Sequence, residues 1–281
     1  MPTTIDTESP ARGPISPDDP LLFSVSSLAR INRCEKQYIL NLRTHRDPAG
    51  PAAWLGTLVH QLVQAHTVGL DWRETWGDIL ASANPEWSAE WDPPEMFSHA
   101  GWLMERYVSH YSPDPFRLQE PEADFSLPVP GIENVILRGY VDGLGVRGLA
   151  HTPALLEIKT MGQWGKFERA EWEPQVHTYI GAMSQRLEEK VSGCLFRAIG
   201  TRHKWNAKTP APVNDSFREV WIPYDQDKID AVLEDYRRAA RRAMHILEHE
   251  EDIRRCVGEH CTYCAFKVGC VLPDTLADGG F

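Results

Sequence analysis

An apolar run that ends in two charged residues constrains this chain most. Residues 154–160 read ALLEIKT, and such a run predicts a buried strand. Side chains two positions apart on a strand point to the same face, so Glu157 and Lys159 should project together. Asp142 stands fifteen residues earlier in RGYVDGLG, which predicts a strand entering a glycine turn. Two converging carboxylates would bind a hard cation such as Mg²⁺ or Mn²⁺, although Glu-x-Lys alone favours an ordinary salt bridge.

Hydrophobic periodicity gives the order of elements around this strand. We expect helices over 27–42 and 54–70, a helical region over 71–111, and strands from residue 117 onward. A helix follows over 171–189, then strands within 190–201 and 217–224, paired across a long loop, and a final helix over 226–255. This order predicts an α/β fold, with a mixed sheet surrounded by helices. The predicted parts are a disordered tail (1–21), an N-terminal helical region (22–116), a sheet core (117–225) and a C-terminal helix with a cysteine cluster (226–281).

The tryptophans are concentrated in the helical region. An aromatic side chain at such positions serves more often as core than as a platform for stacking bases. We therefore expect the five to lie in the core of a helical lobe: Trp72, Trp76, Trp87, Trp91 and Trp102.

Charge and targeting signals narrow the class of protein. The formal net charge is −11, which argues against nucleic-acid binding through a basic overall field but leaves room for an acidic metal site that meets phosphates through the metal. No run of about 18 apolar residues is present, so a membrane-spanning helix is not expected. The N-terminal residues have no apolar segment typical of a secretory signal. We expect a cytoplasmic protein.

Six cysteines are present, and four of them fall within the last 26 residues. A reducing compartment disfavours disulfides and favours metal ligation. Cys194 lies in a strand-like run and is expected to be a buried apolar residue. The others are Cys34, Cys256, Cys261, Cys264 and Cys270.

Two further pairs of residues lie four apart on predicted helices: Gly56 with His60, and Gln175 with Tyr179. A lone histidine is more often a satisfied core residue than a ligand. The ordered set Gly56-x3-His60, Gly139-x2-Asp142, Glu157-x-Lys159 and Gln175-x3-Tyr179, however, resembles the RecB-like branch of the PD-(D/E)XK nuclease superfamily. The resemblance covers residues 22–272 and implies that superfamily's restriction-endonuclease-like core: a mixed sheet flanked by helices, with an N-terminal helical lobe.

The cysteines extend the resemblance. Cys261-x2-Cys264-x5-Cys270 with the distant Cys34 is similar to the iron–sulfur-containing members, among them CRISPR-associated and phage-encoded exonucleases and AddB-type subunits. The resemblance implies that these four hold a 4Fe–4S cluster which staples the two ends of the nuclease domain. Structural zinc is the alternative, but a zinc ribbon needs a second Cys-x2-Cys pair that is missing here. Cys256 remains an alternative ligand to Cys34.

The resemblance also implies a role for each motif residue. The side chains of His60, Asp142 and Glu157, with the backbone carbonyl of Ile158, would ligate one or two divalent ions. Lys159 would orient or activate the attacking water or stabilise the developing phosphorane charge. Gln175 and Tyr179 would position the lysine or contact DNA. A further acidic position matches Glu122, with Glu120 and Asp124 as nearby alternatives.

Two segments are candidates for DNA contact. The loop that holds Arg202, Lys204, Trp205 and Lys208 interleaves basic and aromatic residues, as grooves for single strands do; a solvated hairpin loop fits equally well. Arginines on the last helix form a basic stripe for which a solvated face is the simpler interpretation: Arg237, Arg238, Arg241 and Arg242.

The sequence as a whole predicts a Mg²⁺- or Mn²⁺-dependent DNA exonuclease that prefers single-stranded ends. Its setting would be prokaryotic or phage-related, with a possible homo-oligomer or a recombination or helicase partner. Two alternatives stay open. One is a non-catalytic partner that holds DNA ends for adaptation; the other is a zinc-stabilised endonuclease.

Overall fold

A computed structural model describes residues 20–44, 51–82, 93–149, 151–162, 164–201, 216–264, 266 and 270. The chain divides into two compact units, and neither is continuous in sequence. Unit 1 comprises Met1–Pro48, Pro128–Leu137 and Leu233–Phe281; unit 2 comprises Ala49–Leu127 and Arg138–Val232. Each unit therefore combines segments from different parts of the chain, whereas the parts suggested by the sequence follow one another. Within the described ranges, no helix is long and apolar enough to cross a membrane.

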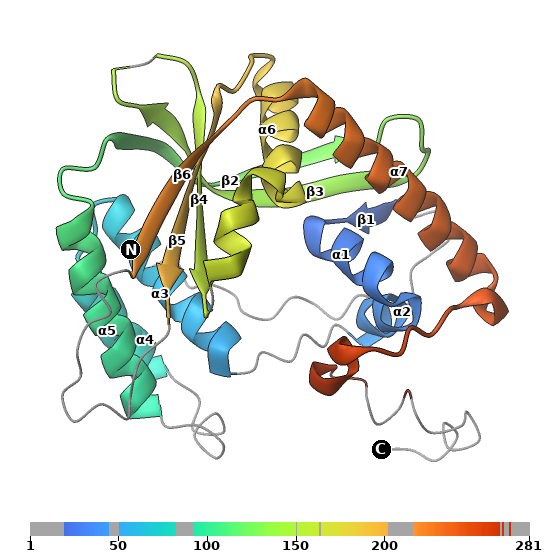
Figure 1. The fold of residues 1–281 in the computed structure, drawn as a ribbon, viewed down its shortest axis with the longest axis horizontal. Coiled ribbons are helices and arrows are strands. Elements are labelled where there is room, and N and C mark those ends of the chain that lie inside the picture. The colour runs from blue at the N-terminus through green and yellow to red at the C-terminus, as the bar shows by residue number, and fades with distance from the viewer. Residues whose placement is uncertain are drawn as a thin grey trace. The chain divides into compact units, whose positions relative to one another are not determined.

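A mixed sheet forms the centre of unit 2 (Figure 1). Its strands run in the order β3-β4-β5-β6, and β2 pairs with β3. The strands β3 and β4 are antiparallel, β4 and β5 are parallel, and β5 and β6 are antiparallel. The mixed sheet and the antiparallel pair at its end confirm the sequence-based prediction. The bounds are β2 Phe116–Pro128, β3 Val135–Arg147, β4 Ala154–Met161, β5 Gly193–Gly200 and β6 Phe217–Pro223.

Helices cover both faces of this sheet. The helices α3 (Pro51–Thr67), α4 (Trp72–Ser82) and α5 (Pro93–His110) pack together on one face, and α6 (Pro174–Leu187) contacts β4 and β5 from the other (Figure 1). Alternate β4 residues Leu156 and Ile158 join the core with α3 and α5. Burial on both faces explains the nearly continuous apolar sequence of β4.

The tryptophan prediction holds where the structure describes those residues. Trp72 is buried in the helical core, and Trp76 and Trp102 are half-buried against it. Trp87 and Trp91 lie outside the described residues.

A 3-10 helix, Trp164–Trp172, precedes α6 in the region where the sequence predicts a helix from residue 171. The α-helix itself begins at Pro174, because proline fixes a helical φ and has no N–H, and so is tolerated in the first turn. This start places Gln175 in the first turn and Tyr179 one turn later.

Unit 1 is built around a small aromatic core. Strand β1 (Leu21–Phe23) pairs in parallel with the first residues of β3, and α1 (Val25–Arg33) and α2 (Glu35–Thr44) follow it. The Phe23 ring centroid lies 5.9 Å from that of Tyr38 on α2 and 6.1 Å from that of Tyr236 on α7 (Gln226–Glu248). Large aromatic burial of this kind supplies most of the stability of a small core.

Two sequence-based predictions about helices in unit 1 are wrong. Residues 27–42 are not one helix, because Cys34 takes an extended conformation (φ −164°, ψ 114°) that separates α1 from α2. The last helix ends at Glu248 rather than at residue 255, and two 3-10 turns follow, Glu250–Asp252 and Glu259–Tyr263. Strand β1 was not predicted, because its three residues are too few to give a periodic signal.

Candidate active site

The charged pair at the end of β4 lies in unit 2 and is joined by a direct contact. Lys159 Nζ lies 2.6 Å from Glu157 Oε1. The Glu157 side chain is 1% exposed, whereas that of Lys159 is 36% exposed. The two therefore project together as the strand alternation predicts. This pair differs from an ordinary surface salt bridge, because a carboxylate that has left water entirely carries a large desolvation cost.

The first two turns of α6 support the same carboxylate. Gln175 Nε2 donates a 2.9 Å hydrogen bond to Glu157 Oε1 and lies 2.7 Å from the Tyr179 hydroxyl, which accepts a second one. The Tyr179 ring packs edge-on against Phe125 at 5.7 Å between centroids. Gly139 makes room for both rings, because a Cβ there would lie 2.7 Å from the Phe125 ring and 3.5 Å from that of Tyr179. The Gln-x3-Tyr and Gly-x2-Asp motifs therefore meet in space.

Asp142 joins the site from β3 and is held by two neighbours. Its Oδ2 accepts a 2.6 Å hydrogen bond from the backbone N–H of Ile158 and lies 2.9 Å from Nε2 of His60 on α3. One turn before His60, α3 passes so close to β4 that a Cβ on Gly56 would stand 2.7 Å from Thr160 Oγ1. The glycine of the Gly-x3-His motif thus permits the close approach that the sequence suggests.

Burial and mutual repulsion of carboxylates dominate the electrostatics of the site. Burial, and then the nearby Asp142 charge, raise the pKa of Glu157 to about 8, even though Lys159 opposes the shift. Burial alone would lower the pKa of Lys159, but Glu157 outweighs it and the net shift is upward. Burial likewise lowers the pKa of His60, and its contact with Asp142 outweighs this so that the net shift is upward. Such perturbed groups converging in one place are typical of a functional site.

Two buried polar atoms in the site have no hydrogen-bond partner: Glu157 Oε2 and His60 Nε2. His60 Nε2 nevertheless faces Asp142 Oδ2 at 2.9 Å, an ion-pair contact. Buried polar atoms are nearly always satisfied, so each exception calls for an explanation. A divalent cation would use both atoms: the carboxylates suit Mg²⁺ or Mn²⁺, and the imidazole adds a nitrogen donor of the kind that transition-metal ions accept. Within the described ranges, no three His, Cys, Asp or Glu side chains already form a metal-binding group.

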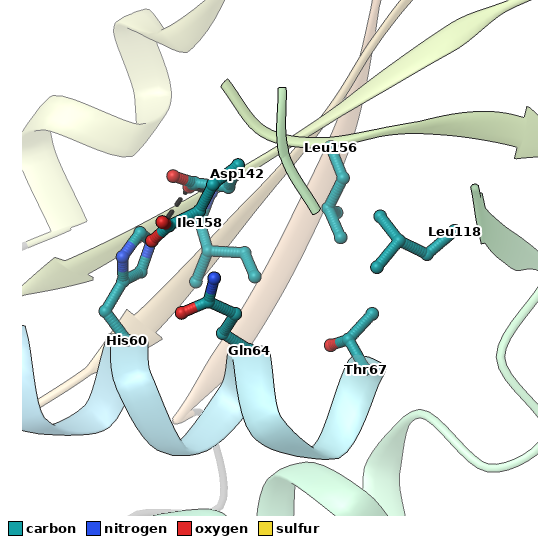
Figure 2. Close-up of a pocket in the computed structure, with 8 residues that line it drawn as sticks. His60, Gln64, Thr67, Leu118, Asp142, Leu156 and Ile158 are labelled. Atoms are coloured by element: carbon teal, nitrogen blue, oxygen red, sulfur yellow. Dashed lines mark hydrogen bonds and ion pairs between the residues drawn. The ribbon is translucent and has the colours of Figure 1, made fainter. Parts of the chain in front are cut away.

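A small cavity opens beside His60 and Asp142 (Figure 2). Its volume of about 10 Å³ is at the lower limit of the space that one bound water molecule needs. Besides these two residues, its walls include Gln64 and Thr67 on the same face of α3, and Leu118, Leu156 and Ile158 from the strands. The sequence analysis missed Gln64, although its position one turn after His60 gave a helical-spacing signal that could have found it.

The cavity also distinguishes the three acidic candidates on β2. Glu122 lines it. Glu120 instead pairs with Arg186 at 2.7 Å, and Asp124 is not part of the cavity wall. Glu122 has φ 45°, an uncommon backbone conformation for a non-glycine residue.

The sequence-predicted cluster cysteines belong to unit 1. Cys34 is buried, and the three C-terminal ones are half-buried: Cys261, Cys264 and Cys270. No three of them form a group in the part of the chain that the structure describes. Cys194 is fully buried in β5, as expected of an apolar core residue.

The predicted DNA contacts divide into two groups. Arg202, Lys204, Trp205 and Lys208 lie outside the described residues. On α7, Arg237 pairs with Glu234 at 3.1 Å and Arg242 pairs with Glu35 at 2.8 Å. The arginine stripe is thus largely engaged in ion pairs, which favours the interpretation as a helix surface.

Comparisons with known proteins agree with this arrangement. The family model of the PD-(D/E)XK nuclease superfamily matches residues 22–271. A putative exonuclease from Eubacterium rectale has a similar fold, with 15% identity, a TM-score of 0.51, and coverage of 85% of this chain and 86% of that one. An alkaline exonuclease from Laribacter hongkongensis gives 14% identity and covers 69% of this chain and 90% of its own, but its TM-score of 0.32 is too low to carry an argument. A search of curated proteins gave no match. The match over nearly the whole described chain, with His60, Asp142, Glu157 and Lys159 assembled, shows that this chain belongs to the PD-(D/E)XK nuclease superfamily.

Proposed function

We propose that the protein is a divalent-metal-dependent nuclease that hydrolyses DNA phosphodiester bonds, proceeding from single-stranded ends. The observation that carries this proposal is the completely buried carboxylate of Glu157. One of its oxygens is held by Lys159 and Gln175, and the other has no partner. In a purely structural salt bridge, a buried oxygen without a partner only costs stability. In a metal site, the same oxygen is available to bind the cation.

The chain's own residues divide the chemical work. His60, Asp142 and Glu157, with the backbone carbonyl of Ile158, would hold Mg²⁺ or Mn²⁺. When bound, such an ion lowers the pKa of a water molecule and polarises a phosphoryl oxygen. Gln175 fixes the rotamer of Glu157. The Lys159 ammonium, which is more exposed than its partner, would stabilise the negative charge that develops on the phosphate oxygens.

The preference for ends and for single strands follows from the resemblance to RecB-like exonucleases rather than from this site's geometry. The Eubacterium rectale protein of similar fold is named a putative exonuclease, which agrees with that form of the proposal. The acidic balance of the chain agrees with DNA that is held locally, by the metal and a few contacts, and not by a broad basic surface.

We further propose that Cys34, Cys261, Cys264 and Cys270 hold a 4Fe–4S cluster. Contacts within unit 1 support this proposal, because they bring the chain after α7 next to the residues that follow Cys34. Glu35 accepts a 2.8 Å hydrogen bond from the Arg254 backbone N–H, and the Lys36 N–H donates to the Arg254 carbonyl at 3.3 Å. Among the described residues, these thiols are not close enough together to form a metal-binding group. Cluster binding would therefore have to rearrange the segment that carries the C-terminal cysteines.

Iron and zinc analysis of anaerobically purified protein tests the cluster. Serine substitution of each of the four cysteines should remove iron and the brown colour, whereas Cys194→Ala should leave both unchanged. Zinc in colourless protein would contradict the cluster. Loss of iron in Cys256→Ser with retention in Cys34→Ser would replace Cys34 by Cys256 in the ligand set.

Degradation of end-labelled single-stranded DNA with Mn²⁺ tests the activity, and Lys159→Ala is the variant to compare. We expect stepwise loss of label by the wild-type protein alone, no cleavage of circular single strands, and no reaction when EDTA is present. Cutting of circles would convert the proposal to an endonuclease. DNA binding without degradation by iron-replete wild-type protein would contradict catalysis and favour a non-catalytic DNA-end-binding partner.

A further inference from the structure

An exposed tyrosine lies beside the candidate metal site on the same strand. Tyr140 is 66% exposed, so its ring is accessible to a ligand. It stands two residues before Asp142 within the uninterrupted strand β3, so both side chains project from the same side. Two residues along a strand span about 6.8 Å. The tyrosine ring is therefore a neighbour of the catalytic carboxylate.

Packing on the opposite side of β3 holds the strand in place beneath Tyr140. Val141 is fully buried, and Gly139 lies against the rings of Phe125 and Tyr179. The strand is thus packed on one side by core and leaves Tyr140 exposed on the other. A tyrosine on a held strand has only its two side-chain torsions to order when it binds a flat partner, which keeps the entropy cost of binding low.

A basic residue extends the row by one more position. Arg138 is exposed and precedes Tyr140 by two residues, so the side chains of Arg138, Tyr140 and Asp142 follow one another along one side of β3. Guanidinium, aromatic ring and carboxylate in this order match a phosphate contact, a base contact and a metal ligand. Sequence-independent binding of single strands uses this combination of cations and aromatic platforms.

We propose that Tyr140 is a base-stacking subsite, and Arg138 its phosphate contact, for the nucleotide next to the scissile bond. This inference rests on the proposed nuclease function and deepens it. The substrate is then an unpaired strand with its bases present, because a base inside a duplex does not expose its face to a side chain. Base stacking on one ring is tolerant of sequence, so the subsite would select single-stranded over double-stranded ends without reading the base.

Binding measurements test the subsite independently of turnover. In the cleavage-deficient Lys159→Ala background, the added change Tyr140→Ala should weaken binding of a short single strand about 5- to 150-fold, the range for one stacked base. Tyr140→Phe should retain the affinity because it keeps the ring. Leu149→Ala, which truncates an exposed side chain beyond the other end of β3, is the matched control and should change nothing.

A strand in which abasic nucleotides replace the bases near its end separates stacking from general disruption. The Lys159→Ala protein should bind this abasic strand equally well with and without Tyr140→Ala. Arg138→Gln should instead weaken binding of both the normal and the abasic strand, and lower the slope of log affinity against log salt by about 0.7. Equal loss for normal and abasic strands, or no loss for either, would overturn the stacking subsite.

Degradation by the wild type of a strand carrying a single abasic nucleotide separates this inference from the nuclease proposal. Stalling at a fixed distance from that nucleotide, absent in Tyr140→Ala, supports both. Uniform degradation without a stall contradicts the subsite and leaves the nuclease intact. A complete lack of degradation contradicts the nuclease, while the binding measurements still decide the subsite.

Discussion

At the scale of single residues, the site depends on one buried carboxylate and the groups that hold it. Glu157 is positioned by Lys159 from its own strand and by Gln175 from α6. Strand alternation alone predicts that Glu157 and Lys159 project together. It does not predict that Glu157 is fully buried, because burial depends on α6, whose packing no local pattern contains.

Removal of the Gln175 amide tests how far this support matters for metal binding. We expect Gln175→Ala to lower activity, or to raise the Mn²⁺ concentration needed for half-maximal activity, about 10- to 100-fold, because groups that orient metal ligands have effects of this size. A Mn²⁺ titration of DNA cleavage measures it. Tyr179→Phe, which removes only the hydroxyl that accepts from Gln175, should have the smaller effect. An unchanged titration for Gln175→Ala would refute a positioning role.

Glu122 and Gln64 are two cavity residues that the sequence alone could not assign to the site. By sequence, Glu122 matches a family position while Glu120 and Asp124 stay as nearby alternatives, and the cavity wall favours Glu122. Gln64 lies four residues after His60, so helical spacing places the two side chains on one face. Glutamine is not a typical metal ligand, however, and its presence in a sequence does not indicate a metal site.

At the scale of elements, the unit 2 sheet carries a second buried charge that is separate from the site. Arg197 on β5 is fully buried. It makes two 2.6 Å hydrogen bonds to the Asp114 carboxylate and lies 3.2 Å from both Glu219 and the Tyr107 hydroxyl. Its guanidinium also lies 4.0 Å from the Tyr111 ring centroid. These contacts tie α5 and the chain after it to the strands that hold Glu157.

Substitution of Asp114 should therefore be strongly destabilising. We expect Asp114→Ala to lower the free energy of unfolding by about 3 kcal/mol, because it leaves a buried guanidinium without its bidentate partner. Urea denaturation measures the change. Glu219→Gln, which removes a single and more exposed contact, should have an effect below about 1 kcal/mol. Equal effects of the two substitutions would contradict the asymmetry that the geometry indicates.

Helices and strands were predicted where an apolar pattern extends over the whole element. They were missed where contacts between distant residues determine the boundary. The sheet strands and α3 were recognisable because their apolar patterns extend over whole elements. The break at Cys34 was not, because residues 27–42 keep helical spacing across it. The extended backbone at Cys34 ends α1, and its carbonyl accepts from the Tyr38 N–H in the first turn of α2.

At the scale of the whole molecule, segments from the two ends of the sequence build unit 1, while unit 2 contains the site. The link between the ends centres on Glu35. Both its oxygens lie 2.8 Å from Arg242, and one also accepts from the Arg254 N–H. Arg242 in turn donates to the Asp252 carbonyl at 2.8 Å. No sequence pattern relates residues 35 and 242, so this contact could not be predicted from the sequence.

The Glu35 link predicts a specific dependence of stability on pH. The hydrogen bond with Arg242 holds the pKa of Glu35 below its usual value of 4.5. The folded state therefore favours the ionised carboxylate, so its stabilisation is complete above the unfolded-state pKa and is lost as pH falls through the lowered folded-state pKa. We expect Glu35→Gln to cost about 2 kcal/mol at pH 7 and much less near pH 3.

Urea denaturation at both pH values measures this difference. Glu234→Gln, which alters exposed pairs on α7, should change stability far less at pH 7. A Glu35→Gln effect that stays the same at both pH values would show that lost packing, not the charge, is responsible.

Isothermal titration calorimetry of Mn²⁺ binding tests whether His60, Asp142 and Glu157 form a cation site that Lys159 serves without being a ligand. We predict that wild-type protein and Lys159→Ala bind Mn²⁺, and that Glu157→Gln, which keeps the shape but removes the charge, does not. Glu35→Gln, a buried carboxyl of unit 1, should bind as the wild type does. Equal Mn²⁺ binding by wild-type protein and Glu157→Gln, or no binding by either, would contradict the account.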